Sequence, residues 1–221
     1  MTKTRNAAVQ GGYTLIEFMI AIFILLLFFA VGYLTLFPIM SYLNSGQAKI
    51  ATQANAVPLL YKLQRETRQS DYRAIYIMPA SAATSLPTTL TDVTRFAVAT
   101  AKIGTAGSSC FPGGDFDTVP GYGQPMWHGF EVFMLENATL KCAYEPFSPA
   151  QQAFPTSGQA TTAINSALAL ANPPVFGAAV LDIKIKADPT AYVTDFLIKA
   201  ISTVNGRSNA TTYTEDILTR N

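Results

Sequence analysis

Few side chains in this sequence are of the types that perform catalysis, and they are scattered. The chain of 221 residues has a single histidine, His128, next to its single tryptophan, Trp127. It contains no Gly-x-Ser-x-Gly, His-Glu-x-x-His or Cys-x-x-Cys motif, so a hydrolytic triad or a zinc site lacks the residues it needs. We therefore expect no enzymatic activity and no cofactor, and we interpret His128 as a partly buried loop residue.

Two carboxylates, Asp115 and Asp117, share a glycine-rich stretch over residues 113–117. Such a pair is a candidate calcium site, but the EF-hand pattern is absent. Two acids also fall short of the roughly 6 to 8 oxygen ligands that calcium takes. Turn-forming aspartates are the better interpretation, and no metal site is expected.

The most unusual carboxylate is that of Glu17, because it precedes a long apolar run. From Phe18 to Met40 there are 23 residues without a charge, and a spanning helix needs about 20. A carboxylate at the centre of a bilayer costs roughly 2.5 to 3.5 kcal/mol on insertion scales, so Glu17 needs a partner or a place near the surface. Lys3 and Arg5 precede the run, which keeps the N-terminus in the cytoplasm and exports the residues after 40.

The residues before this run, Gly12-Tyr13-Thr14-Leu15-Ile16-Glu17, resemble the class III signal of type IV pilins and type II secretion pseudopilins. An ordinary secretory signal is cleaved after its apolar stretch, whereas here the small residues come before it. The resemblance implies that a prepilin peptidase cuts between Gly12 and Tyr13, and that Tyr13 becomes the N-methylated terminus. Phe is the commonest first residue in the family, so Tyr13 is a departure that keeps an aromatic ring.

Glu17 is then the fifth mature residue, about one helical turn from the new terminus. Cleavage creates a positive amine at Tyr13, and a carboxylate can neutralise an amine inside an apolar bundle. The resemblance implies that this amine belongs to a neighbouring subunit, which makes Glu17 a filament-assembly residue. The alternative is a signal-anchor helix with Glu17 near the lipid headgroups. Removing Lys3 and Arg5 from fifteen basic residues leaves thirteen against fourteen acids, a mature charge of −1.

Periodicity predicts the elements that position these residues. We expect a leader over residues 1–12 and a long helix over 13–70, with the transmembrane segment at about 18–40. Past Met40 the helix is predicted to be amphipathic, with Glu66 among the polar residues between its apolar positions. The apolar positions, at spacings of three and four, are Ile50, Ala54, Val57, Leu60, Tyr61, Leu63 and Thr67. The fold class predicted is α+β, in which this helix packs on an antiparallel β-sheet as in the pilin fold.

Residues 71–221 are predicted to form an exported, β-rich head. Leu181, Ile183 and Ile185 alternate with polar residues, which is typical of a half-buried antiparallel strand, and Asn137-Ala138 suggests a hairpin turn. Three long inserts, residues 79–91, 104–125 and 146–174, separate the strands, and 161–171 is a candidate short helix. The strand candidates are 71–78, 94–103, 129–136, 139–145, 178–186, 192–204 and 211–218.

Cys110 and Cys142 are the two cysteines of the chain. Both lie in the exported part, where thiols are oxidised, so one disulfide is predicted. Two buried free thiols are the alternative. Major pilins usually place their disulfide nearer the C-terminus, so this pairing departs from the family pattern.

Charge argues against a polyanion partner. Charged residues make up 13% of the chain, the net charge is +1 and no Lys/Arg cluster is present, so nucleic acid is not an expected partner.

The resemblance implies a structural subunit that enters the inner membrane as a single-pass protein in the lipid bilayer. Its partners would be prepilin peptidase, the inner-membrane assembly platform and other pilin or pseudopilin subunits, in a filament of the periplasm or cell surface.

The length of 221 residues and the long inserts favour a minor component over a major one, and two short segments bear on its type. Residues 63–69 are similar to the end of the long helix in W-type minor pilins and J-type minor pseudopilins, and Arg220-Asn221 is similar to the ending of several minor pilins. We therefore expect a minor pilin that primes assembly or lies near the tip of a type IV pilus. The alternatives are a J-type pseudopilin of type II secretion, a tip adhesin and a membrane-anchored periplasmic binding protein. Residues 146–181 have no charge, which favours a surface or protein ligand over DNA.

Overall fold

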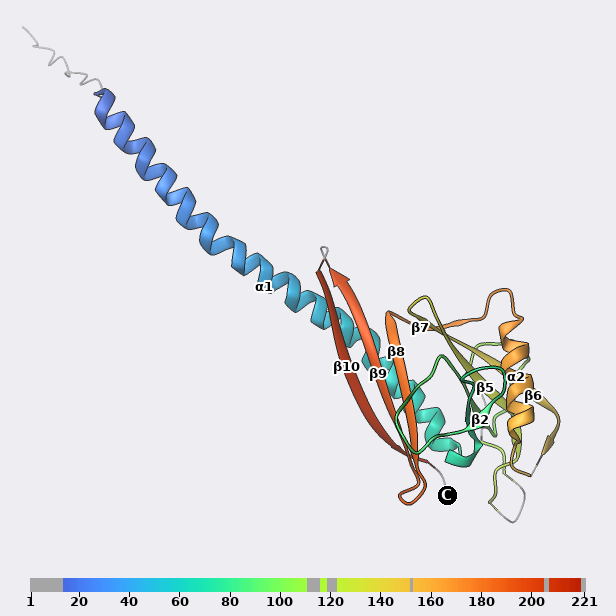
Figure 1. The fold of residues 1–221 in the computed structure, drawn as a ribbon. Helices are drawn as coiled ribbons and strands as arrows, with labels where there is room; N and C mark the ends of the chain where they lie inside the picture. Colours follow the sequence, from blue (N-terminus) through green and yellow to red (C-terminus); the bar gives the residue numbers. More distant parts are fainter. Residues whose placement is uncertain (1–13, 111–115, 119–122, 152, 205–206, 220–221) are drawn as a thin grey trace, which may run out of the picture. The chain divides into compact units, whose positions relative to one another are not determined.

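The first element of the protein is a single long helix. The computed structural model describes residues 14–110, 116–118, 123–151, 153–204 and 207–219, and helix α1 runs over Leu15–Gln69 (Figure 1). The chain forms two compact units, Met1–Gly46 and Gln47–Asn221, and the boundary falls inside α1.

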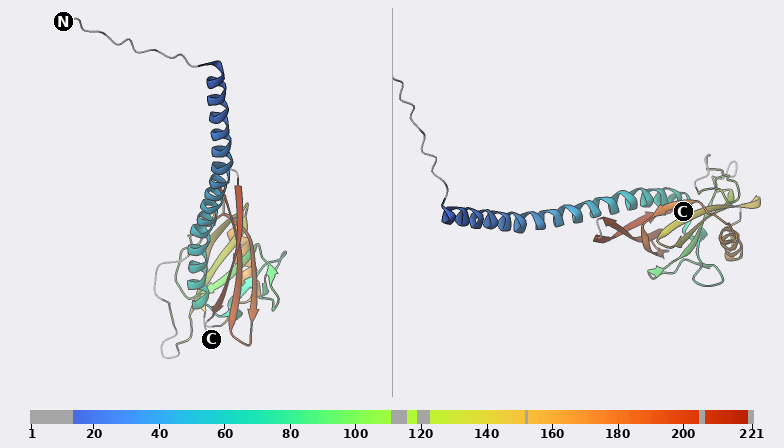
Figure 2. Two further views of the ribbon diagram at one scale, coloured as in Figure 1. Left: turned by 90° about the vertical axis from the view of Figure 1, so that its left-hand side faces the viewer. Right: turned by 90° about the horizontal axis from the view of Figure 1, so that it is seen from above.

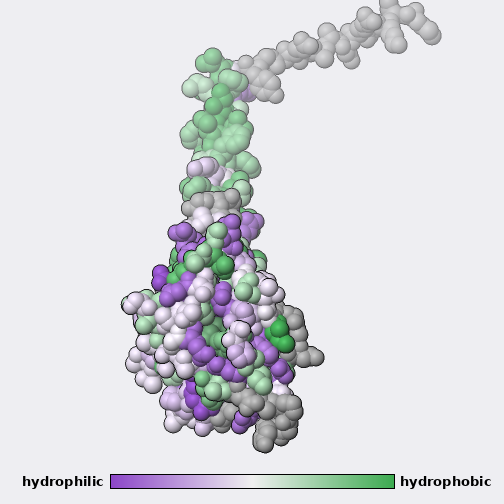
Figure 3. Space-filling model, turned by 90° about the vertical axis from the view of Figure 1, so that its right-hand side faces the viewer, coloured by the Kyte–Doolittle hydropathy of each residue, from purple (hydrophilic) through white to green (hydrophobic). Residues whose placement is uncertain are grey.

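In the first unit, the large apolar side chains of α1 from Leu15 to Leu43 are exposed. Figure 3 shows this part of the helix as a nearly continuous hydrophobic surface. By length and composition the helix is able to cross a membrane, since about 20 apolar residues suffice. A bilayer would cover the surface that the isolated chain leaves exposed.

The second unit contains two antiparallel sheets. The first sheet has six strands in the order β2-β1-β4-β5-β6-β7, and the second has four in the order β10-β9-β8-β3. The first sheet is formed by β1 (Ile75–Ile77), β2 (Thr84–Ser85), β4 (Arg95–Thr100), β5 (Trp127–Glu136), β6 (Thr139–Gln151) and β7 (Val175–Ala178). The second is formed by β3 (Thr91–Asp92), β8 (Val180–Asp188), β9 (Val193–Val204) and β10 (Arg207–Leu218). A 3-10 turn, Tyr72–Ala74, leads from α1 into β1.

One core joins the C-terminal part of α1 to both sheets. Leu59 and Leu63 of α1 are buried in it, and Phe96 of β4 stacks on Phe133 of β5 with ring centroids 4.7 Å apart. Phe96 also contacts Phe196 of β9, so the two sheets share this core. Figure 2 shows the same part of α1 beside the second sheet. The predicted α+β class, a long helix followed by antiparallel sheet, is confirmed.

A second core lies on the opposite face of the first sheet. Along β4, Phe96 and Val98 belong to the first core, whereas Ala97 and Ala99 belong to the second, as the alternation of strand side chains requires. Helix α2 (Ser157–Leu168) covers this face with four buried residues, Ala160, Ala163, Ile164 and Ala167. The sequence pattern predicted a loop over 146–174 with a helix at 161–171, but β6 extends to Gln151 and the helix starts four residues earlier.

The predicted hairpin at Asn137-Ala138 is confirmed. Both residues have positive φ, 49° and 57°, as in the type I′ turns that suit the twist of paired strands. They connect β5 to β6, with Glu136 paired to Thr139.

Two sequence predictions of burial are wrong. Leu181 is 42% exposed, because the register of β8 shifts between Val180 and Asp182 and Val180 takes the buried position. On α1, Ile50, Val57 and Tyr61 are exposed and Glu66 is buried. Leu63 and Thr67 of the predicted apolar set are buried, so the face of α1 that packs on the sheets coincides only in part with the one that apolar spacing indicated.

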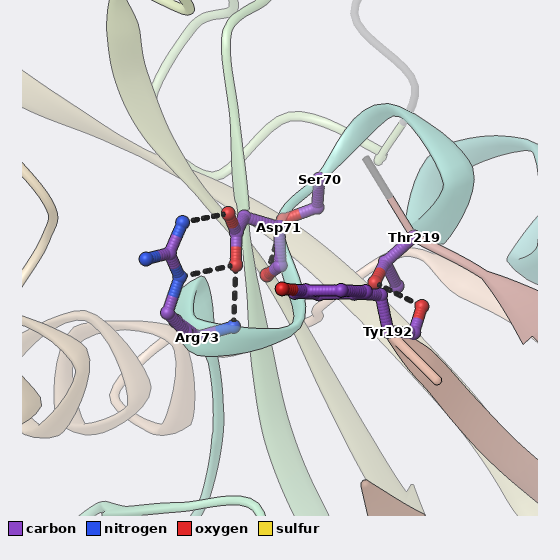
Figure 4. A network of polar contacts seen from close by, with 5 residues as sticks. All are labelled: Ser70, Asp71, Arg73, Tyr192 and Thr219. Carbon is purple, nitrogen blue, oxygen red and sulfur yellow. Dashed lines mark hydrogen bonds and ion pairs between the residues drawn. The ribbon is translucent and has the colours of Figure 1, made fainter. Parts of the chain in front are cut away.

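Polar contacts hold the exit of α1 and the last strand in place (Figure 4). Asp71 accepts bonds from the backbone N–H of Arg73 (2.8 Å), from its Nε (3.0 Å) and from its Nη2 (2.7 Å). After β10, Thr219 donates its N–H and its hydroxyl to the carbonyl of Tyr192. The Tyr192 ring lies edge-on to that of Tyr72. These contacts connect the α1–β1 junction to the β8–β9 turn and to the C-terminal end of β10.

Cys110 and Cys142 are joined by a disulfide, with their Cα atoms 5.5 Å apart. Both are buried in the first core. The bond ties the loop before Cys110 to β6, where Ser109 also pairs with Ala143.

We expect the double variant Cys110→Ala/Cys142→Ala to lose about 2 to 4 kcal/mol of unfolding free energy, since the bond closes a loop of 32 residues and removes entropy from the unfolded chain. Urea unfolding of the full chain in detergent would measure this loss. The reduced wild-type protein is the control and should unfold at about the same urea concentration as the variant. A variant as stable as the oxidised wild type would contradict the prediction.

Candidate functional site: the N-terminus of α1

The N-terminus of α1 is closed by a capping box made of Thr14 and Glu17. Thr14 precedes the first helical residue, and its N–H and hydroxyl both donate to Oε2 of Glu17, at 2.8 and 3.0 Å. In return, the Glu17 N–H donates to the Thr14 hydroxyl at 3.4 Å. The first backbone N–H groups of a helix have no partner inside it, so this reciprocal pair satisfies two of them. The negative carboxylate also faces the positive end of the helix dipole.

This cap fixes where the Glu17 carboxylate lies. Both bonds from Thr14 use the same oxygen, Oε2, and an ionised carboxylate has a second oxygen that can accept a bond from an amine. Glu17 is exposed and stands at the start of the exposed apolar surface. The arrangement therefore presents one negatively charged hydrogen-bond acceptor, the second carboxylate oxygen of Glu17, at the end of an apolar helix.

The cleavage and methylation residues predicted from the sequence, Gly12 and Tyr13, lie outside the described residues. So does Asp115, the first member of the candidate calcium pair. For these three residues the predictions stay predictions.

The comparisons with known proteins concern this same segment. Residues 8–33 match the family model described as the prokaryotic N-terminal methylation motif. The chain contains a prepilin-type signal. No curated protein and no solved structure matches the chain.

The match confirms the predicted resemblance to the class III signal of type IV pilins and pseudopilins. It spans Gly12, Tyr13 and Glu17 together with much of the apolar run. A prepilin-type signal is the substrate of prepilin peptidase, and its apolar helix fits an inner-membrane anchor. The distinction between W-type and J-type is not made by this motif.

Two other candidate residues, His128 and Asp117, contact each other. Nε2 of His128 lies 2.7 Å from Oδ2 of Asp117. His128 is partly buried as predicted, but it belongs to β5 and not to a loop. Among the described residues, no group of three or more His, Cys, Asp or Glu side chains could hold a metal ion. The pair serves to fasten the segment around Asp117 to the sheet.

Sequence reasoning overlooked the role of Thr14. The signal was available, because a Ser or Thr followed three residues later by Glu, ahead of an apolar run, is the pattern of a capping box. It also missed the burial of Glu66, whose Oε2 lies 2.9 Å from Nζ of Lys102. That contact joins residues 36 positions apart, and no local pattern indicates it.

Proposed function

We propose that this chain is a minor pilin-like structural subunit of a type IV pilus. The observation on which this rests is the methylation motif at residues 8–33, which runs directly into an exposed apolar helix. In this proposal prepilin peptidase cleaves between Gly12 and Tyr13 and methylates Tyr13. The inner-membrane platform then moves the subunit from the bilayer into a filament.

The surface of α1 supports an assembly role. In an apolar bundle of helices, the Glu17 carboxylate would neutralise the terminal amine of a neighbouring subunit. The exposed residues Ile50, Val57 and Tyr61 recur at spacings of seven and four, which places them on one side of the helix. They extend the apolar surface available for contact beyond the membrane segment.

The proposal divides the chain by role. Residues 1–12 are the leader, 13–70 form the long helix with its membrane segment at about 18–40, and 71–221 form the exported head. The N-terminus is cytoplasmic before cleavage. The resemblance of residues 63–69 to the end of the long helix in minor pilins supports a minor subunit that primes assembly or lies near the tip. A J-type pseudopilin of type II secretion is the second candidate, because residues 63–69 resemble both types.

The first experiment measures the intact mass and N-terminal sequence of the membrane-extracted chain, expressed with and without a prepilin peptidase. We expect peptidase-dependent loss of residues 1–12 and a methylated Tyr13. The variant Gly12→Leu is the matched control and should stay full-length in both strains, because its larger side chain replaces the glycine at the cut. An intact N-terminus on the wild-type chain in both strains would overturn the proposal.

A further inference from the structure

A surface cleft of about 500 Å³ lies between the C-terminal half of β6 and helix α2. Its size falls in the range of small-ligand sites, roughly 300 to 1,000 Å³. One wall is the segment Glu145–Gln151 and the other is the face of α2 that bears Gly158, Thr162 and Ser166. Figure 1 shows α2 covering the side of the first sheet away from α1.

Half of the residues that line the cleft bear side-chain groups that both donate and accept hydrogen bonds. Hydroxyls of Ser148, Thr156, Thr162 and Ser166 and the amides of two glutamines face the cleft. Hydroxyl and amide groups have both donors and acceptors. Phe147 and four smaller residues without polar side chains supply the remaining uncharged surface, so the cleft combines apolar surface with polar groups that both donate and accept. The four are Pro146, Pro149, Gly158 and Ala163.

The charge of the cleft is equally distinctive. Glu145 is the only ionisable side chain among the residues that line it, and none of these residues is Lys, Arg or His. Burial raises the pKa of the Glu145 carboxyl, because a partly buried site disfavours the ionised form. An anionic ligand would meet this carboxyl without a compensating cation, so the lining selects against anions.

The walls are held in place by contacts of their own. Gln151 and Gln159 exchange amide bonds across the cleft, with Nε2 of Gln159 2.8 Å from Oε1 of Gln151. Thr156 and Gln159 form a capping box at the start of α2. The Thr161 hydroxyl accepts a bond from the N–H of Ala83 at 2.9 Å, which ties α2 to the loop after β1. A fixed set of polar groups lowers the entropy lost when a ligand binds.

We propose that this cleft is a binding site for a neutral carbohydrate. Each sugar hydroxyl donates and accepts, as the hydroxyls and amides of the lining do, and a volume of this size holds one or two sugar rings. A peptide strand would pair with a sheet edge through its backbone, but Pro146 and Pro149 leave this part of β6 without two of the N–H donors that such pairing uses. The inference goes beyond the structural role proposed above and does not depend on it.

The position of the cleft makes it accessible in a filament. The buried face of α2 belongs to the second core, while α1 belongs to the first, on the other face of the sheet. Contacts made through α1 therefore leave the α2 side of the head open. Figure 3 views the protein from this side, where most residues of the head are hydrophilic or of intermediate hydropathy.

The test measures binding of the purified full chain in detergent to immobilised glycans. The neutral probes are lactose, cellobiose and N,N′-diacetylchitobiose, and the anionic probes are sialyllactose and a sulfated heparin disaccharide. We expect binding to at least one neutral probe and none to the anionic ones. Ser166→Leu should weaken this binding about tenfold or more, a loss of about 1.4 kcal/mol, because its side chain fills the cleft.

Asn165→Leu is the matched control, since Asn165 is exposed on the same turn of α2 but does not line the cleft; its binding should be unchanged. Gly158→Leu is a second filling variant: a Cβ at Gly158 meets only the Thr156 hydroxyl, at 3.8 Å, so it should fold normally. The inference is overturned if no neutral probe binds more strongly to the wild type than to both filling variants, or if the anionic probes bind equally well. Because no filament is involved, this result is independent of the processing and assembly experiments.

Discussion

Replacing Glu17 by Ala is expected to remove the chain from filaments while leaving it in the membrane. The uncharged run from Phe18 to Met40, which by length and composition is able to cross a bilayer, begins after Glu17 and is unchanged by the substitution. What is lost is the one negative charge at the start of α1, which in the proposed filament neutralises the amine of a neighbouring subunit. An amine buried without a partner in an apolar bundle is costly, so incorporation should fall at least about tenfold. Quantifying the variant in sheared filaments and in membranes measures both effects.

Two companion variants separate the charge from the cap. Glu17→Gln keeps an acceptor for Thr14, because Gln also serves in a capping box, but it removes the charge. Thr14→Ala keeps the charge and loses the cap, which costs about 1 kcal/mol. If charge pairing drives assembly, Glu17→Gln should be as defective as Glu17→Ala, while Thr14→Ala should assemble substantially. Wild-type amounts of Glu17→Ala in sheared filaments would refute the assembly role, and a defect confined to Thr14→Ala and Glu17→Ala would assign Glu17 to capping alone.

The sequence was sufficient to predict those elements that local chemistry determines. The uncharged run from Phe18 to Met40 indicates the apolar N-terminal helix. Asn137, a residue type that tolerates positive φ, indicates the hairpin turn between two strand-like runs. The signal at Glu17 was recognisable because it concerns consecutive residues. All of these features depend on neighbours in the chain, which a sequence displays directly.

Features that depend on distant contacts were not predictable in the same way. Leu181 fits the alternation of its strand, but a register shift at Val180 turns it to solvent. Ile50 and Val57 have the spacing of core positions, but both are exposed, because the sheets pack on Leu59 and Leu63. The cleft requires α2 to fold back over β6, and an uncharged stretch of sequence gives no indication of that placement. Periodicity identifies an apolar face, but only the fold determines which face is covered.

The clearest case is the buried ion pair between Glu66 and Lys102, which joins the last turn of α1 to the segment after β4. Nζ of Lys102 lies 2.9 Å from Oε2 of Glu66, and the two side chains are 9% and 3% exposed. Arg65 also binds Glu66, at 2.8 Å, but is half exposed. We expect Lys102→Met to lower the unfolding free energy by about 3 kcal/mol, because it leaves the Glu66 charge buried with only the solvated Arg65 beside it. Urea unfolding of the full chain in detergent measures the change.

A double-mutant cycle shows why that loss should exceed the net contribution of the pair. Glu66→Met/Lys102→Met removes both charges and fills the same space, so its stability should return to within about 1 kcal/mol of the wild type. The surface pair of Lys141 and Glu136 has the same 2.9 Å separation with larger exposure, and Lys141→Met should cost less than about 1 kcal/mol. The cycle is completed by the single variant Glu66→Met. If the double variant lost as much unfolding free energy as the two single variants together, the residues would act independently. The loss would then come from packing and not from an unpaired buried charge. If the double variant instead regains most of the wild-type stability, the loss in each single variant comes from one charge that stays buried without its partner. The Glu66–Lys102 pair would then couple α1 to the sheet by matching the two charges.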